Sequence, residues 1–332
     1  MRGVPVQVVS DVAHLEFAVA DDGTLTYASG GGPSLSTLVW VDRQGRETAL
    51  EAPPRPYNYP RLSPDGTRVA LDVGSPDRDI WIWDARRRAL ERFTVDPAGN
   101  PLVAWNPDGT KIAFGSDRFG PTNLFLQPAD SSAEPQRLLK SDRLQMPLTF
   151  APDGRLLFSE EVPKRGRDIQ ALSLDGSGRV QSLVHSPALD ATAEVSADGR
   201  WLAYDSNESG QFEVYVRPYP DADRARWQVS VGGGRQPLWS REGRELFYRD
   251  FSGDIMSVPV VVTSTFSAGQ AVKLLDGSGY LGGGSFMSAR SYDLSLDGRR
   301  FLMLKPVSSG AARSLVVVLN WFEELKRLVP SR

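Results

Sequence analysis

The chain has 332 residues, of which 40% are hydrophobic and 24% are charged, with a formal net charge of −3 and no cysteine. This composition is typical of a globular protein with a substantial core, and the weakly acidic balance argues against a general nucleic-acid binder, which needs a basic surface to displace counterions. The lack of cysteine excludes disulfides, zinc–thiolate centres and cysteine nucleophiles, and no apolar run approaches the ~18 residues of a membrane-spanning helix.

A short pattern recurs along the chain: an apolar segment, a turn that ends in Asp-Gly or Glu-Gly, and a second apolar segment. Successive turn glycines are 43 to 45 residues apart, except for a last interval of 55 residues, and they are Gly23, Gly66, Gly109, Gly154, Gly199, Gly243 and Gly298. A period of about 44 residues is typical of a four-stranded propeller blade. The turn sequence Ser63-Pro64-Asp65-Gly66 suits a tight hairpin, because proline presets φ and glycine accepts a positive φ.

The repeat therefore predicts an all-β fold, a seven-bladed β-propeller of four-stranded antiparallel blades, with six or eight blades as alternatives. The chain 1–332 is expected to form a single domain, with blades near 12–51, 57–95, 100–140, 145–185, 191–231, 235–276 and 290–319. The last repeat lacks a fourth strand, and we expect the segment 4–9 to supply it and close the ring, because closure removes exposed strand edges. Residues 320–329 are expected to form a short amphipathic helix.

The Ser-Pro-Asp-Gly turns, the strand Asp79-Ile80-Trp81 and the segment Leu38–Gly45 resemble the repeats of TolB-like propellers, which are themselves similar to WD repeats. Together with the segment Leu319–Leu325, they resemble more narrowly the C-terminal sensor propeller of bacterial membrane-anchored serine/threonine protein kinases. The resemblance implies a non-catalytic sensor that binds a small ligand, a peptide or a protein. It also implies a location on the periplasmic or cell-surface side of a bacterial membrane, with tethering to a kinase domain and a membrane span in a longer protein.

Catalytic chemistry is not indicated by the sequence. The kinase motifs and the Gly-x-Ser-x-Gly elbow of hydrolases are absent, and the two histidines, His14 and His185, have no partners at the spacing of a metal site. We therefore predict no catalytic residue, no metal and no cofactor. The alternative hypothesis is a metal-dependent hydrolase or lactonase with acidic residues in the central channel.

Alignment of the repeats on their turn glycines places six residues at one equivalent position of the innermost strands: Arg61, Ala104, Thr149, Glu194, Leu238 and Asp293. The polar members of this set and their neighbours are predicted to form a ligand site at the channel mouth, consisting of Arg61, Glu194, Asp293, Gln145, Gln236 and Tyr292, with Arg290 close by. Ion pairing within the ring is the alternative role for the charged residues. Aromatic residues expected in loops are the predicted partner interface, because exposed aromatics anchor protein partners; they are Tyr57, Tyr59, Phe119, Tyr219 and Tyr280.

Overall fold

The computed structural model describes residues 12–29, 35–74, 78–263, 265–282, 289–307 and 314–328. The chain divides into two compact units, whereas the sequence led us to expect one domain. The larger unit is Ser36–Pro306, and the smaller unit contains the described elements from the two ends of the chain. No helix among the described residues is long and apolar enough to cross a membrane.

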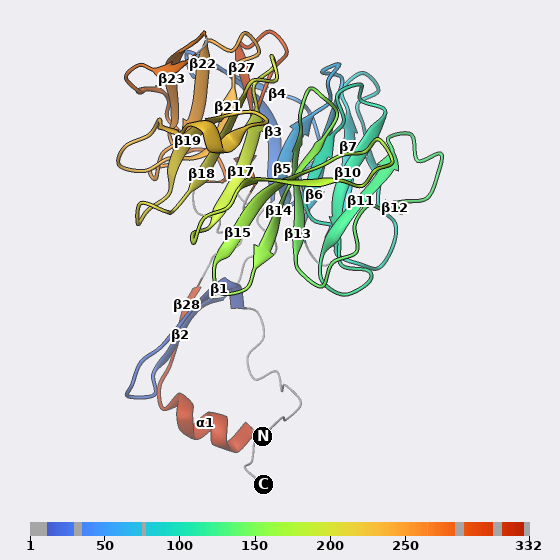
Figure 1. Ribbon diagram of the computed structural model, residues 1–332. Helices are drawn as coiled ribbons and strands as arrows, with labels where there is room; N and C mark the ends of the chain where they lie inside the picture. Colours follow the sequence, from blue (N-terminus) through green and yellow to red (C-terminus); the bar gives the residue numbers. More distant parts are fainter. Residues whose placement is uncertain are drawn as a thin grey trace. The chain divides into compact units, whose positions relative to one another are not determined.

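Six antiparallel sheets make up the larger unit, and we number them as blades 1 to 6 of a β-propeller (Figure 1). Blade 1 consists of β5 (Tyr57–Leu62), β6 (Arg68–Val73), β7 (Asp79–Asp84) and β8 (Ala89–Arg92). Blade 2 consists of β9 (Val103–Trp105), β10 (Lys111–Ser116), β11 (Asn123–Pro128) and β12 (Gln136–Arg137). Blade 3 consists of β13 (Gln145–Phe150), β14 (Leu156–Val162), β15 (Gly166–Leu172) and β16 (Val180–Val184). Blade 4 consists of β17 (Asp190–Val195), β18 (Trp201–Ser206), β19 (Glu213–Pro218) and β20 (Trp227–Gln228), with a 3-10 turn at Ala222–Arg224. Blade 5 consists of β21 (Arg235–Trp239), β22 (Glu245–Arg249), β23 (Ile255–Val262) and β25 (Val272–Leu275), with β24 (Phe266–Ala268) as a short addition to β23. Blade 6 consists of β26 (Asp293–Leu294), β27 (Arg300–Pro306), β3 (Ser36–Asp42) and β4 (Glu47–Ala49).

The turn between the first two strands of each blade is held by its own backbone and side chains. In blade 1, the Gly66 N–H donates to the Ser63 carbonyl oxygen at 2.8 Å, and the Arg68 N–H donates to the Ser63 hydroxyl at 2.9 Å. Gly66 has a φ of +71°, a value that glycine adopts without steric cost. The strands that follow these turns, such as β18, are buried along their length because each sheet packs between two others.

The first strand of each blade is the innermost one; from β5 to β21 each contacts the first strand of the next blade, and β26 lies next to β5. Blades 5 and 6 are joined by the Tyr292 hydroxyl, which donates to the Gln236 carbonyl oxygen at 2.8 Å. Four of the inner strands carry a register shift at the same place, between residues Asn58/Arg61, Pro147/Thr149, Asp190/Ala193 and Arg235/Leu238. Such bulges increase the local twist and change which side chains face the axis.

The all-β prediction is confirmed, but the seven-bladed ring is not what the structure has. The expected blades at 12–51 and 290–319 are divided: β27 pairs with β3 from Arg300↔Asp42 to Pro306↔Ser36, so strands from the two ends of the larger unit share blade 6. This pairing closes the ring and removes two exposed edges. The structure therefore favours the six-bladed alternative.

The smaller unit contains the repeat that the ring does not use. Its sheet has the order β1 (Val12–Val19), β2 (Leu25–Ser29) and β28 (Ser314–Val318), and the turn at Asp22–Gly23 joins β1 to β2. Helix α1 (Trp321–Leu328) follows, where a helix at 320–329 was expected, and the Trp321 N–H donates to the Gly23 carbonyl oxygen at 2.6 Å. The segment 4–9, predicted as the closing strand, lies outside the described residues.

Candidate functional site

A cavity of about 350 Å³ lies on the axis of the propeller at the side of the turns, and every blade contributes to its wall. We call it the channel cavity. The equivalent position of each inner strand lines it: Arg61, Ala104, Thr149, Glu194, Leu238 and Asp293. The repeat alignment thus placed all six residues correctly around one space, while ligand binding there stays a prediction.

The channel cavity is closed on its inner side by apolar residues. Tyr59, Leu102, Met146 and Ala289 form a buried cluster further along the inner strands. The space near this cluster, beside Leu102 and Ala289, measures only about 10 Å³. For the part of the chain that the structure describes, the cavity is therefore a pocket that opens at the turns.

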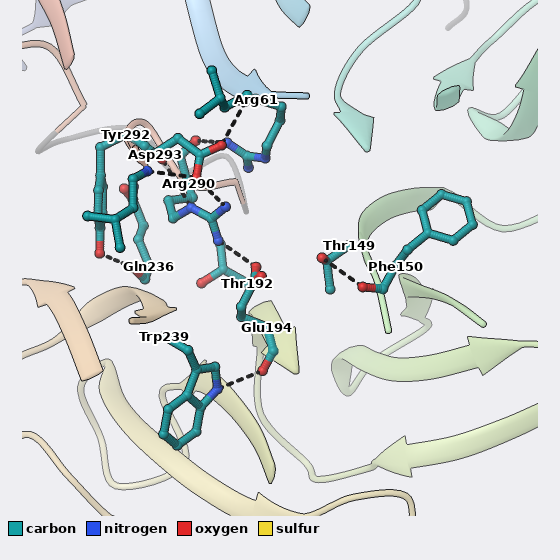
Figure 2. A network of polar contacts seen from close by, with 12 residues as sticks. Arg61, Thr149, Phe150, Thr192, Glu194, Gln236, Trp239, Arg290, Tyr292 and Asp293 are labelled. Atoms are coloured by element: carbon teal, nitrogen blue, oxygen red, sulfur yellow. Dashed lines mark hydrogen bonds and ion pairs between the residues drawn. The ribbon is translucent and has the colours of Figure 1, made fainter. Parts of the chain in front are cut away.

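Arg290 is the centre of the charged network in the cavity wall (Figure 2). Its Nη1 contacts Glu194 Oε2 at 2.6 Å, and its Nη2 contacts Asp293 Oδ1 at 3.3 Å. The second oxygen of Asp293 accepts a hydrogen bond from the Leu62 N–H at 2.8 Å. Burial by itself would lower the pKa of Arg290, but the two carboxylates outweigh burial and the pKa is raised. Both acidic groups of the predicted site are therefore ion-paired with one guanidinium, in agreement with the alternative role of ion pairing.

Arg61 has a different environment from Arg290. Its Nη1 donates to two backbone carbonyl oxygens, of Pro60 at 2.8 Å and of Arg290 at 2.6 Å. Among the described residues, no carboxylate lies within ion-pair distance of its guanidinium. Burial, with repulsion from Arg290, outweighs the attraction of Asp293 and Glu194 and lowers the pKa of Arg61 to about 10, so the group stays charged at neutral pH. An anion that entered the cavity would supply the partner that this cation lacks.

Arg241 is a third cation of the cavity wall, and the sequence analysis missed it. It occupies the second position of the turn in blade 5, where the first three blades have Pro64, Pro107 and Pro152, which also line the cavity. The charged residue in place of proline at this turn position is the sequence feature that could have identified Arg241 as part of the cavity wall. With Arg241, the wall has three arginines against two carboxylates.

Three residues of the predicted ligand site do not line the cavity. Gln145 is buried on β13, and its Nε2 donates to Glu160 Oε1 at 2.9 Å. Gln236 is buried and accepts hydrogen bonds through Oε1 from the Ser291 N–H and hydroxyl, at 3.0 and 2.8 Å. Tyr292 is fully buried, with its hydroxyl on the Gln236 carbonyl oxygen. These side chains bond to neighbouring strands and loops and lie outside the lining of the channel cavity, where they were expected.

The predicted aromatic interface is also mostly buried. Tyr57 and Tyr59 lie on β5 in the core, and Tyr219 is buried with its hydroxyl 3.1 Å from Asp153 Oδ2. The Tyr280 hydroxyl donates to Glu47 Oε1 at 2.7 Å, and its ring packs partly against the core. Phe119 alone among the five is widely exposed, at 65%. Burial removes Tyr57, Tyr59 and Tyr219 from the surface, whereas a partner role for Phe119 and the partly exposed Tyr280 stays a prediction.

The described residues contain no group of three or more His, Cys, Asp or Glu side chains that could hold a metal ion. The two acidic residues in the channel cavity face Arg290, which occupies the position that a cation would need. The hydrolase alternative therefore has no ligand cluster to support it in this part of the chain.

Several known proteins are similar to this propeller in sequence or in structure. No protein-family model matches the chain. The Tol-Pal system protein TolB of Francisella tularensis subsp. tularensis is 27% identical over 198 residues, which are 57% of this chain and 45% of TolB. An uncharacterized protein of Agrobacterium fabrum is 25% identical over 238 residues, 71% of this chain and 80% of that protein. This chain thus spans about half the length of the curated TolB relatives that it matches.

Solved structures agree on the fold. A protein from Agrobacterium tumefaciens described as TolB superposes with a TM-score of 0.64 and 17% identity, over 83% of this chain and 100% of that one. TolB from Acinetobacter baumannii superposes with a TM-score of 0.56 and 15% identity, over 85% of this chain and 67% of that one. The fold and the ring of inner strands define a β-propeller. Among propellers, the chain is similar to TolB in sequence and in fold.

Proposed function

We propose that this chain is a non-catalytic binding module whose channel cavity receives an acidic group of a protein or peptide partner. The observation that carries the proposal is the Arg61 guanidinium, which lies in the wall of a 350 Å³ pocket with only backbone carbonyl oxygens as partners. A guanidinium in a partly desolvated wall binds a carboxylate through charge-assisted hydrogen bonds, which are stronger than neutral ones. The matching relatives include a protein of the Tol-Pal system, which supports a protein partner.

The test compares two capped peptides, Ac-Gly-Asp-Gly-NH2 and Ac-Gly-Asn-Gly-NH2, by isothermal titration calorimetry. We expect the aspartate peptide to bind the wild-type protein about 10-fold more tightly than the asparagine peptide, which corresponds to ~1.4 kcal/mol. Arg61→Gln should reduce this ratio to about 1, because the partner of the carboxylate is lost. Arg86→Gln is the matched control, since Arg86 is an exposed arginine of a surface turn on blade 1. A preference that persists in Arg61→Gln would contradict the proposal.

We propose further that the module is the extracytoplasmic sensor propeller of a longer, membrane-tethered signalling protein, of the kinase type that its turns and its segment Leu319–Leu325 resemble. An antibody raised against this chain, whose mass is 36.4 kDa, should then detect a clearly heavier band in the membrane fraction of the native cells. That band should be shortened by protease added outside the inner membrane. A band near the mass of this chain in the cytosolic fraction would contradict this part of the proposal.

A further inference from the structure

The blades share a second equivalent position, on the outer side of each turn. The residue at this position accepts the backbone hydrogen bond that closes the turn, and it is Arg68, Lys111, Arg155, Trp201, Glu245 or Arg300 in blades 1 to 6. In five blades the side chain has a partner. Three are arginines that lie over an aromatic ring: Arg68 over Trp105 at 4.6 Å, Arg155 over Tyr219 at 4.7 Å and Arg300 over Trp40 at 5.0 Å. Trp201 packs on Phe266 with ring centroids 5.7 Å apart, and Glu245 forms an ion pair with Arg43 at 2.6 Å.

Lys111 of blade 2 is the exception. Its ammonium makes no hydrogen bond, ion pair or ring contact with any residue that the structure describes. Beside it, between blades 2 and 3, lies a cavity of about 580 Å³, which we call the blade 2–3 groove. Partly buried apolar side chains form its floor, namely Leu126, Leu138, Phe150 and Leu174.

The interface between blades 4 and 5 shows what fills such a space. Phe266, on the added strand β24, is 3% exposed and lies among three tryptophans, Trp201, Trp227 and Trp239, at centroid distances of 5.7, 5.6 and 6.2 Å. These tryptophans have equivalents in the blade 2–3 groove. In blade 4, Ala203 pairs with Val216, which pairs with Trp227. In blade 2, Ala113 pairs with Leu126, which pairs with Gln136. Gln136 is therefore the equivalent of Trp227. Lys111 corresponds to Trp201, because each accepts the hydrogen bond that closes the turn of its blade. Phe150 corresponds to Trp239, because each directly precedes the turn of the next blade.

The charged residues at the rim of the groove differ in whether they have hydrogen-bond or ion-pair partners. Asp108 accepts hydrogen bonds from the Thr110 N–H and hydroxyl, and Asp153 is paired with Arg155 at 2.7 Å. Among the described lining residues, Lys111 is the one cation of the rim; it has no ion pair within 4 Å and only attracts Asp108 at longer range, which helps to lower the pKa of that carboxyl. A ligand for this groove therefore needs a flat apolar group for the floor and an acidic group for the rim.

We propose that the blade 2–3 groove binds an extended segment of a partner protein, which inserts an aromatic side chain between the blades and pairs an adjacent acidic residue with Lys111. The chain's own Phe266 is the precedent for the aromatic group, and β24 is the precedent for its delivery by an extended strand. Burial of an aromatic ring supplies most of the affinity of such contacts. The groove adjoins the channel cavity, with which it shares Asn106, Pro107, Phe150 and Pro152. Lys111, Leu126, Leu138 and Leu174 line the groove alone, so a ligand held by them goes beyond the proposed function.

The experiment uses the full chain with 13C-labelled leucine methyl groups and the peptide Ac-Ser-Asp-Phe-Asp-Ser-NH2. We expect a saturable shift of the Leu126, Leu138 and Leu174 methyl resonances, with a Kd on the order of 0.1–1 mM. The peptide with alanine in place of phenylalanine should bind at least ~10-fold more weakly, because it cannot fill the gap. Lys111→Glu should weaken the aspartate peptide about 5-fold and should instead favour the peptide with lysine in place of aspartate. Lys140→Glu, on an exposed lysine of the same blade outside the groove, is the matched control.

A second variant keeps the proposal open to refutation if the charge change alone is small. Gln136→Trp copies Trp227 on an exposed position of the edge strand and should fill the gap, so binding should be lost while the remaining methyl spectrum stays that of the folded protein. Shifts confined to Leu148 and Leu238, which line the channel cavity, would overturn the proposal. So would equal binding of the alanine peptide, or no saturable shift up to about 5 mM peptide.

Discussion

Replacement of Arg290 by methionine should lower the free energy of unfolding by about 3–5 kcal/mol, as expected when one partner of a buried ion pair is removed. Arg290 is 7% exposed, and its guanidinium contacts both Glu194 and Asp293. Without it, neither carboxylate has an ion-pair partner among the described residues, and their repulsion and desolvation destabilise the native state. Urea denaturation at neutral pH measures the loss.

Two further variants distinguish the network from a general effect of mutation in the cavity. Arg61→Met removes a guanidinium that is bonded only to carbonyl oxygens, and we expect it to cost about 1 kcal/mol or less. The triple variant of Arg290→Met with Glu194→Gln and Asp293→Asn should recover most of the stability, because the two side chains at 194 and 293 are then neutral and no longer repel each other. A loss below about 1 kcal/mol for Arg290→Met would mean that the network does not stabilise the ring.

Phe266→Ala should lower the free energy of unfolding by about 3–5 kcal/mol, the cost typical of deleting a buried aromatic ring. The ring fills the interface of blades 4 and 5 between Trp201 and Trp239. Its removal leaves a cavity that the three large indole groups cannot close without leaving their rotamers. Denaturation monitored by tryptophan fluorescence measures both the stability and the altered surroundings of the indoles.

The matched control for Phe266→Ala is Val261→Ala on the same hairpin, where the side chain is 61% exposed. Surface changes of this kind stay within about 0.5 kcal/mol. If the two variants lost the same stability, the hairpin backbone and not the inserted ring would hold these blades together. The comparison with the open blade 2–3 groove would then have no basis.

The sequence predicted the cavity wall because the turns fix the register of the inner strands. Arg61, Glu194 and Asp293 each lie five residues before a turn glycine, and a hairpin with one closing pattern presents that position to the same side in every blade. The carboxylate pairing to Arg290 could not be predicted in the same way. Arg290 lies within the long interval between Gly243 and Gly298, where the spacing departs from the repeat.

The residues that the sequence placed incorrectly share one physical cause, a local change of strand geometry that the repeat pattern does not show. Gln236 has a φ of +61° within a bulge, and its side chain therefore points to the neighbouring strand and not into the cavity. Tyr57 and Tyr59 were expected in a loop, but β5 begins at Tyr57 and buries both rings. The number of blades depended on long-range pairing of β3 with β27, for which the sequence carries no local signal.

A crystal structure of the protein grown with Ac-Gly-Asp-Gly-NH2 tests the central claim most directly. The account predicts that the aspartate carboxylate lies in the channel cavity, at about 2.7–2.9 Å from the Arg61 guanidinium nitrogens, the distance of a charge-assisted hydrogen bond. The ion pairs of Arg290 with Glu194 and Asp293 should be unchanged in that complex. Peptide density only outside the ring, or an empty cavity under conditions that saturate binding in solution, would contradict the account.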